Sequence, residues 1–198
     1  MRIGFLGAGS WGTALAVVLH KNGHEVTIWS IAQDEIDMLK KEREHKDKLP
    51  GVKIAEEIGL TTDLKEAISG RDMLVVRSTA KSMAPYVEDG QLLVSVAKGI
   101  EEGTLMTLSA ILEQEIPQAE VAVLCGPSHA EEVGIGLPTT LVAGAKRKET
   151  AELVQSTFMN EVLRVYTSPD VLGMELGASR WRPEWRTDSD TAITRRRH

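Results

Sequence analysis

A glycine-rich segment near the start of the chain has the residue types and spacing that hold a phosphate group. It reads Gly7-Ala8-Gly9-Ser10-Trp11-Gly12. The first glycine permits a tight turn, the second lets the backbone approach a pyrophosphate, and the third allows a helix to pack closely on a strand. Apolar residues precede the segment and a helical pattern follows it, so a helix N-terminus faces the same place. The pattern therefore predicts a dinucleotide site; the alternative is a glycine-rich turn without a ligand.

The residues that follow the second apolar run normally distinguish NAD from NADP. An acidic residue about twenty positions beyond the glycine-rich segment would bind the ribose 2′-hydroxyl of NAD. The chain reads Trp29-Ser30-Ile31-Ala32 there, and the first acidic residue after this segment is Asp34. No arginine marks a site for the 2′-phosphate of NADP. Both cofactors stay open at this point.

Two later segments also have the residue types of a ligand site. Lys98 comes just past a buried apolar run, and ligands bind at that end of strands in open α/β sheets; a solvated lysine in a turn is the alternative. The segment 125–132, Cys-Gly-Pro-Ser-His-Ala-Glu-Glu, places Ser128 before a helical pattern. Backbone N–H groups and the Ser128 hydroxyl there suit an anion or a substrate oxygen, and the alternative is that Ser128 only caps the helix.

Strand-like apolar runs alternate with helical patterns, and this order decides where the three segments lie. Strands are expected at 2–6, 25–29, 73–76, 92–96, 121–124 and 139–143, and helices at 13–21, 34–44, 64–69, 105–114, 131–134 and 148–159. The alternation predicts an α/β fold of Rossmann type, with a doubly wound, mostly parallel sheet and helices on both faces.

Composition and charge exclude several classes of protein. The chain has 198 residues and a net charge of −6, yet residues 180–198 hold six arginines against three acidic residues, so the rest is more acidic still. Such a body is poorly suited to nucleic acid. No apolar run approaches the ~18 residues of a membrane span. The chain has one cysteine, and its first strand-like run leaves no room for a signal peptide. Both features favour a cytoplasmic protein. No metal site is predicted, and the oligomeric state stays open.

Taken together, the order and spacing of these segments resemble the bacterial NAD(P)-dependent glycerol-3-phosphate dehydrogenases. The matching stretches are 7–15, 49–52, 97–101, 126–133, 137–139, 164–167 and 171–177, and the resemblance covers essentially all of residues 1–179. It implies interconversion of dihydroxyacetone phosphate and sn-glycerol 3-phosphate, a phospholipid precursor, with NADP or NAD as cofactor.

The resemblance also implies roles for single residues. Beside the glycines of the loop (Gly7, Gly9 and Gly12), the cofactor contacts would be Ser10, Trp11, Lys98 and Ala130, and the substrate contacts would be Lys98, Gly126 and Ser128. Hydride transfer needs no nucleophile, so Cys125 is expected to be a small buried residue. His129 is not expected to be catalytic. The alternatives are a dinucleotide-binding module without catalysis and a dehydrogenase of another hydroxyacid.

The chain departs from the family after residue 178. The family continues with a helix that carries a lysine, the expected general acid, and with an all-helical C-terminal domain that closes over the substrate. Here no lysine follows Lys148, and we expect the helical domain to be missing. We therefore expect a dinucleotide-binding domain at 1–179, a non-homologous segment at 180–198, no assigned catalytic residue, and little activity from this polypeptide.

The arginine-rich segment 180–198 has the amino-acid composition expected when a gene is translated in a shifted reading frame. Codons for alanine and glycine, read one nucleotide late, yield arginine, and a shifted reading of the family's next segment reproduces residues 181–198. We hypothesise a frameshift and a disordered tail, which sequencing the gene beyond its stop would test. The alternative is an arginine-rich arm for nucleic acid or an anionic membrane.

A second departure lies between residues 72 and 80. Relatives extend this strand through a Val-Pro-Ser segment that touches the cofactor, whereas here Val76 runs straight into Arg77-Ser78-Thr79-Ala80. A few residues are expected to be lost in frame, with damage to both the central sheet and the cofactor site.

Overall fold

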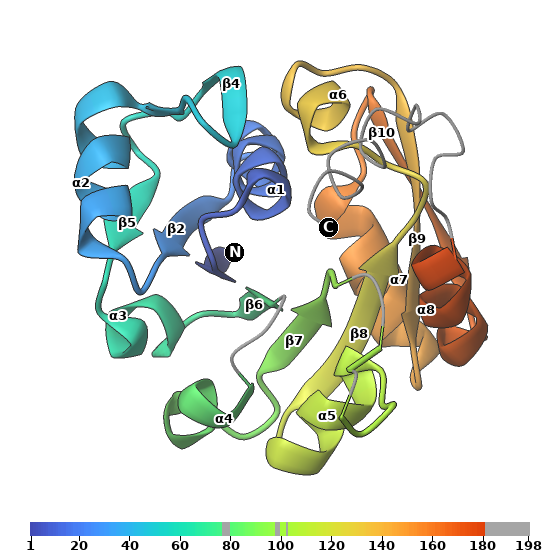
Figure 1. Ribbon diagram of the computed structural model, residues 1–198. Coiled ribbons are helices and arrows are strands. Elements are labelled where there is room, and N and C mark those ends of the chain that lie inside the picture. Colours follow the sequence, from blue (N-terminus) through green and yellow to red (C-terminus); the bar gives the residue numbers. More distant parts are fainter. Residues whose placement is uncertain (77–79, 98–99, 102, 181–198) are drawn as a thin grey trace, which may run out of the picture.

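An eight-stranded sheet runs through the part of the chain that the structure, a computed structural model, describes: residues 1–76, 80–97, 100–101 and 103–180 (Figure 1). The strands are β1 (Arg2–Leu6), β2 (Glu25–Trp29), β5 (Gly59–Thr61), β6 (Met73–Val76), β7 (Leu92–Ser95), β8 (Glu120–Cys125), β9 (Thr139–Ala145) and β10 (Leu163–Ser168). Their order is β10-β9-β8-β7-β6-β1-β2-β5. The pairs are parallel except β8 with β9, which is antiparallel.

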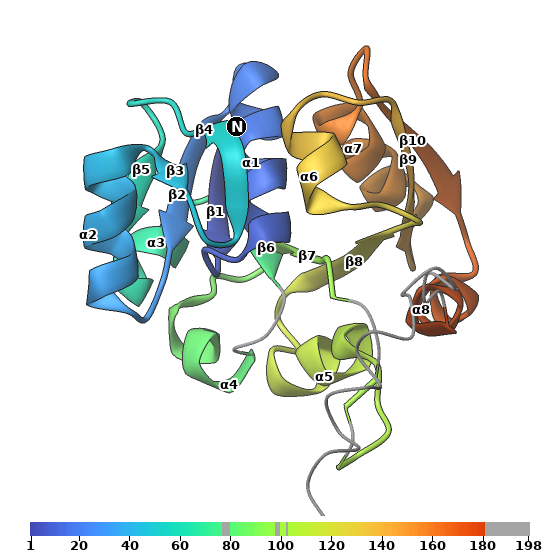
Figure 2. The same ribbon diagram turned by 45° about the horizontal axis from the view of Figure 1, so that its top comes forward.

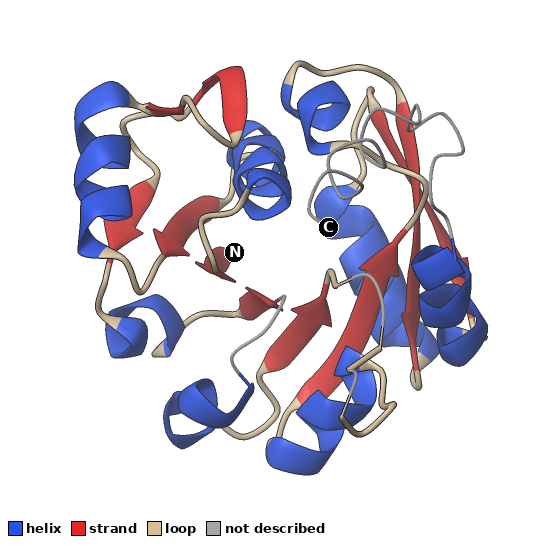
Figure 3. Ribbon diagram, viewed as in Figure 1, coloured by secondary structure: helices blue, strands red, loops and turns tan. Residues whose placement is uncertain are grey.

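Helices cover both faces of this sheet (Figures 2 and 3). They are α1 (Ser10–Lys21), α2 (Gln33–Glu42), α3 (Leu64–Ile68), α4 (Ala80–Met83), the short 3₁₀ helix η1 (Ala84–Tyr86), α5 (Leu108–Glu115), α6 (Ala130–Gly134), α7 (Lys148–Phe158) and α8 (Val171–Arg180). Alternate residues of each strand face opposite sides. Ile3 and Phe5 of β1 join a core with α1, α2, α6 and α7, whereas Leu6 joins a core with α3, α4 and α5. The predicted doubly wound α/β fold is confirmed.

Several predicted helix ends are wrong, because contacts distant in sequence override the local pattern. The second helix does not continue to residue 44: Arg43 adopts a left-handed conformation with φ 48°. Its guanidinium donates to the carbonyls of Ala55 and Ile58 at 3.2 and 3.1 Å, which turns the chain into the hairpin of β3 (Glu44–His45) and β4 (Leu49–Lys53). This small second sheet was not predicted.

The helix expected from residue 105 also begins later. Leu105 has φ 57° and is exposed. The N-cap of α5 is Thr107, whose Oγ1 accepts a hydrogen bond from the Ala110 N–H. Such a cap fixes where a helix starts, because it satisfies an N–H group that has no partner within the helix.

The central sheet is intact at the second departure from the family. Strand β6 pairs along its whole length with β1 and with β7, from Met73 opposite Ile3 to Val76 opposite Leu6. The expected damage to the sheet is therefore wrong. Arg77, Ser78 and Thr79, where damage to the cofactor site was expected, lie outside the described residues, as does the segment 181–198.

The longest helix of the described residues is α1, with 12 residues. A helix needs about 20 apolar residues to cross the hydrocarbon core of a bilayer. Within the described part of the chain, no helix has the length and apolar character for such a crossing.

Candidate functional site

The glycine-rich segment forms the turn between β1 and α1. Gly7 has φ 126°, a backbone conformation that residues other than glycine rarely adopt. Its N–H donates to the Trp29 carbonyl at 2.9 Å. A Cβ on Gly12 would lie 2.8 Å from the Gly7 carbonyl oxygen, so α1 packs against the turn only with glycine there. Gly9 is the N-cap of α1 in an extended conformation. The first and third glycines thus do what their spacing predicts.

A cavity of about 230 Å³ opens beside this turn. Its lining combines the turn with the ends of three strands: Phe5, Leu6, Gly7, Gly9, Trp11, Gly12, Val75 and Val96. Strands β1 and β6 are neighbours, and the chain winds outward from them in opposite directions. This is the point at which ligands bind in open α/β sheets. The backbone N–H groups of the first turn of α1 face an anion placed there.

A second cavity of about 260 Å³ shares Trp11 and Val96 with the first. Its remaining lining residues are Ser10, Ser128, His129, Ala130 and Glu131. The fold thus brings Ser10 and Trp11, from the start of the chain, together with Ser128 and Ala130. Ser10, Trp11 and Ala130 were predicted as cofactor contacts and Ser128 as a substrate contact, and all four line this one cavity.

Gly126 and Ser128 are held by contacts of their own. A Cβ on Gly126 would lie 2.8 Å from the Thr140 carbonyl oxygen, so this glycine permits a close approach to β9. The Ser128 hydroxyl is buried and donates to the Gly126 carbonyl at 3.4 Å. His129, not Ser128, is the N-cap of α6. Lys98 lies outside the described residues.

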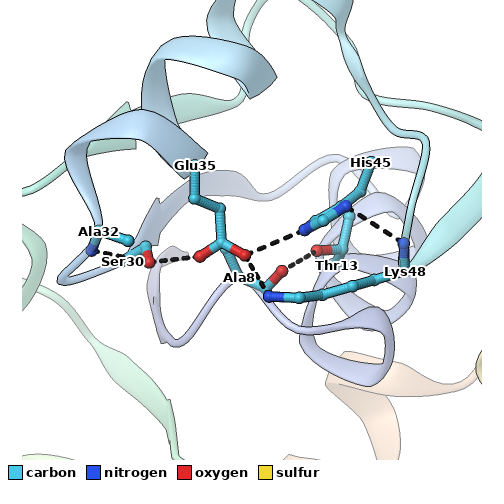
Figure 4. Close-up of polar contacts among 7 residues, drawn as sticks. All are labelled: Ala8, Thr13, Ser30, Ala32, Glu35, His45 and Lys48. Atoms are coloured by element: carbon cyan, nitrogen blue, oxygen red, sulfur yellow. Dashed lines mark hydrogen bonds and ion pairs between the residues drawn. The ribbon is translucent and has the colours of Figure 1, made fainter.

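A cluster of polar side chains at the end of β2 was missed by the sequence analysis (Figure 4). Glu35, in the first turn of α2, accepts hydrogen bonds on Oε2 from the Ser30 hydroxyl and on Oε1 from Lys48 Nζ and, at 3.0 Å, from His45 Nε2. We call these four residues the Glu35 cluster. The only signal of this cluster in the sequence is a glutamate five positions beyond Ser30.

The hydrogen bonds of the Glu35 cluster fix its protonation. Nδ1 of His45 accepts from the Lys48 backbone N–H at 3.3 Å, so the imidazole carries its proton on Nε2, which donates to the carboxylate. Burial alone would raise the pKa of the Glu35 carboxyl, but hydrogen bonds from Lys48, Ser30 and His45 outweigh burial and hold this pKa below its usual value. Glu35 is therefore a carboxylate at neutral pH.

Among the residues described, no three His, Cys, Asp or Glu side chains gather in a way that would hold a metal ion. Cys125 is buried, and its thiol contacts the Met174 carbonyl at 3.5 Å.

Comparison with known proteins identifies the family. The family model described as "NAD-dependent glycerol-3-phosphate dehydrogenase N-terminus" matches residues 2–151. The chain belongs to this family. The resemblance seen in the sequence is thereby confirmed.

Curated relatives in the family are bacterial proteins named glycerol-3-phosphate dehydrogenase [NAD(P)+]. One from Agathobacter rectalis is 64% identical over 185 residues, and the match covers 90% of this chain and 55% of the relative. One from Fusobacterium nucleatum is 48% identical over 188 residues, with 90% and 56% covered. The chain spans about half the length of the curated relatives it matches.

The fold agrees with a crystal structure of glycerol-3-phosphate dehydrogenase from Coxiella burnetii. The TM-score is 0.83 at 31% sequence identity, and the match covers 89% of this chain and 56% of that one. The dehydrogenase from Saccharomyces cerevisiae shares the fold at 19% identity, with a TM-score of 0.78.

Proposed function

We propose that this chain is the dinucleotide-binding half of an NAD(P)-dependent glycerol-3-phosphate dehydrogenase. The reaction is dihydroxyacetone phosphate + NAD(P)H + H⁺ ⇌ sn-glycerol 3-phosphate + NAD(P)⁺, in which the reduced nicotinamide supplies the hydride. The observation that carries the proposal is the cavity at the carboxyl ends of β1 and β6, lined by Gly7, Gly9 and Gly12 in a chain of this family.

The residues present fit a dinucleotide. The turn at Gly7 leaves open space where a side chain would project, because no heavy atom lies within 4 Å of the Cβ position there. Backbone N–H groups at the start of α1 would hold the pyrophosphate. Trp11 and Val96 line both cavities, so they would cover the boundary between cofactor and substrate and exclude water there. Ser128, buried in the second cavity, would offer its hydroxyl to a substrate oxygen.

The proposed setting is the cytoplasm, and the proposed partner is a small phosphate ester. The chain contains one cysteine and therefore forms no internal disulfide, as is usual in a reducing compartment. Its net charge of −6 argues against a nucleic-acid partner.

A charge placed at the start of α1 tests the proposal. Ser10 is the first residue of this helix. A carboxylate at that position is stabilised by the positive end of the helix dipole, but it repels a bound pyrophosphate. We expect Ser10→Asp to weaken NADH binding by at least about tenfold while the free energy of unfolding stays equal or rises. NADH fluorescence titration and urea denaturation measure the two effects.

Ser10→Asn is the matched control, because it has the same shape without the charge, and it should weaken binding much less. Dinucleotide binding is wrong as a function if the unmodified chain binds neither NADH nor NADPH, or if Ser10→Asp binds them as tightly as Ser10→Asn does.

A further inference from the structure

The Glu35 cluster lies where a dinucleotide-binding sheet meets the adenosine ribose. Ser30 directly follows β2, and the preceding residue, Trp29, accepts the hydrogen bond from Gly7 of the phosphate turn. In folds of this type the side chain at the end of the second strand faces the ribose hydroxyls. Ser30 occupies that position in this chain, and its short hydroxyl side chain lacks the carboxylate that usually binds them.

Helix α2 returns a carboxylate to the same place. The Ala32 N–H donates to the Ser30 hydroxyl oxygen at 3.3 Å, which bends the chain directly after the strand. The first turn of α2 then follows, and the Ser30 hydroxyl donates to Glu35. Figure 4 shows the Glu35 side chain pointing from α2 toward Ser30. Serine and glutamate together thus place a carboxylate where an aspartate at position 30 would place its own.

This carboxylate is held in one orientation and keeps an acceptor site. It receives hydrogen bonds from Ser30, His45 and Lys48. A carboxylate offers about four acceptor positions, so about one remains for a ligand hydroxyl. The Glu35 side chain is 14% exposed, against 3% for His45, so the glutamate reaches the surface and the histidine supports it from behind.

Among the described residues, the surroundings of Ser30 offer little to a phosphate group. Ile31 follows Ser30 and is 85% exposed, which suits contact with an apolar face such as that of adenine. The 2′-phosphate of NADP(H) is usually recognised by an Arg or Lys side chain close to the end of the second strand. The one cation in the Glu35 cluster, Lys48, has its ammonium in contact with the carboxylate.

We propose that Glu35 recognises the adenosine ribose of NAD(H) through its 2′-hydroxyl and rejects the 2′-phosphate of NADP(H). This inference rests on the proposed dinucleotide binding and adds the residue that selects the cofactor. Ser30, His45 and Lys48 are positioning residues for the carboxylate.

Direct binding of NADH and NADPH to the whole chain, measured by calorimetry, tests the inference. The unmodified chain should bind NADH at least about tenfold more tightly than NADPH, in line with one hydrogen bond to a charged group. In Glu35→Gln, NADH binding should weaken and NADPH binding should strengthen, so that the ratio of the two dissociation constants falls about tenfold or more. A merely structural role of Glu35 would weaken both alike, and this result would overturn the inference.

Two matched measurements complete the test. Asp34→Asn removes one charge from an exposed residue of the same helical turn and should leave the ratio unchanged. If Glu35→Gln does not fold, NAD⁺ is compared with its 2′-deoxyadenosine analogue on the unmodified chain. The analogue should bind several-fold more weakly, and equal binding would overturn the inference. Binding of neither dinucleotide would overturn the proposed function itself, whereas binding of both with equal affinity overturns only the role of Glu35.

Discussion

Glu35 shows how a half-buried charge is held by hydrogen bonds in this protein. Only 14% of its side chain is exposed, and three donors surround the carboxylate, one from the end of β2 and two from the β3–β4 hairpin. Removing such an acceptor leaves its donors without a partner, which costs more than the hydrogen bonds themselves contribute. The cluster therefore ties the β3–β4 hairpin to the end of β2, whatever ligand it meets.

The lowered pKa of Glu35 predicts how this contribution depends on pH. A carboxyl whose pKa is lower in the folded chain than in the unfolded chain stabilises the fold above its unfolded pKa, and this stability is lost as the pH falls through the folded pKa. The difference in free energy of unfolding between the unmodified chain and Glu35→Gln should thus be largest above about pH 5 and shrink below about pH 4. Urea denaturation across this range measures it.

Glu152→Gln is the control for that series, since Glu152 lies in an exposed pair with Lys148. Its effect should stay within about 0.5 kcal/mol at every pH. A Glu35→Gln difference that is the same at about pH 3 as at about pH 7, on either side of the usual carboxyl pKa, would contradict the prediction.

Gly12 carries a second prediction at the scale of one residue. A methyl group there would meet the Gly7 carbonyl oxygen at 2.8 Å, so the turn or α1 must move. We expect Gly12→Ala to lower the free energy of unfolding by about 1–3 kcal/mol and to weaken NADH binding. Gly177→Ala in α8, where nothing lies within 4 Å of the added methyl, should instead stabilise by up to about 1 kcal/mol. Equal effects of the two substitutions would show that the close contact does not matter.

At the scale of elements, a buried carboxylate joins α8 to α5. Glu175 of α8 is 3% exposed and accepts from the Ser109 N–H at 3.2 Å and from the Ser109 hydroxyl at 2.5 Å. It thus satisfies an N–H group in the first turn of α5, which no carbonyl within that helix reaches. One side chain in the middle of α8 thus holds the start of α5, a helix far from it in the sequence.

Glu175→Ala should therefore destabilise the fold by about 1–3 kcal/mol, because it leaves the buried Ser109 N–H without the acceptor that it has in this fold. Amide hydrogen exchange should become faster in α8 and at the start of α5, and remain unchanged in α1. Glu175→Gln keeps an acceptor oxygen and should recover most of the stability. The prediction fails if alanine and glutamine have the same effect.

Elements were predictable from the sequence where the local pattern decides them. The strands at 2–6, 25–29 and 73–76 have the predicted bounds, because each is an apolar run between turn-forming residues. Elements β3, β4, β5, β10, α4 and α8 were not predicted. The hairpin of β3 and β4 depends on Arg43, whose left-handed backbone is held by carbonyls more than ten residues away.

At the scale of the whole molecule, strand order decides where the site lies. Strands β1, β2 and β5 follow one another toward one edge of the large sheet, and β6, β7 and β8 follow one another toward the other edge. The two halves therefore meet between β1 and β6. The described residues therefore form the cofactor side of a site, in a chain that spans 55% of its Agathobacter rectalis relative.

This predicts a separation of binding from turnover. We expect the 198-residue polypeptide to bind NADH but to reduce dihydroxyacetone phosphate at least ~10²-fold more slowly than the full-length relative. The family's expected general acid is a lysine, and no lysine follows Lys148 in this polypeptide. General acid catalysis typically raises a reaction rate ~10²–10⁴-fold. Cofactor absorbance gives the rate, with the Agathobacter rectalis protein assayed in parallel. Turnover within about tenfold of that protein would contradict the expectation.

The sequence by itself determined the phosphate turn, the alternation of strands and helices, and the family. These depend on residues close together in the chain, such as Gly7 and Gly12, whose backbone requirements are visible in their spacing. Only the tertiary structure joined Ser10 and Trp11 to Ser128 and Ala130 in one cavity, and only it formed the Glu35 cluster. The physical reason is that a hydrogen bond between side chains depends on how α2 and the β3–β4 hairpin fold over the end of β2, which no local pattern records.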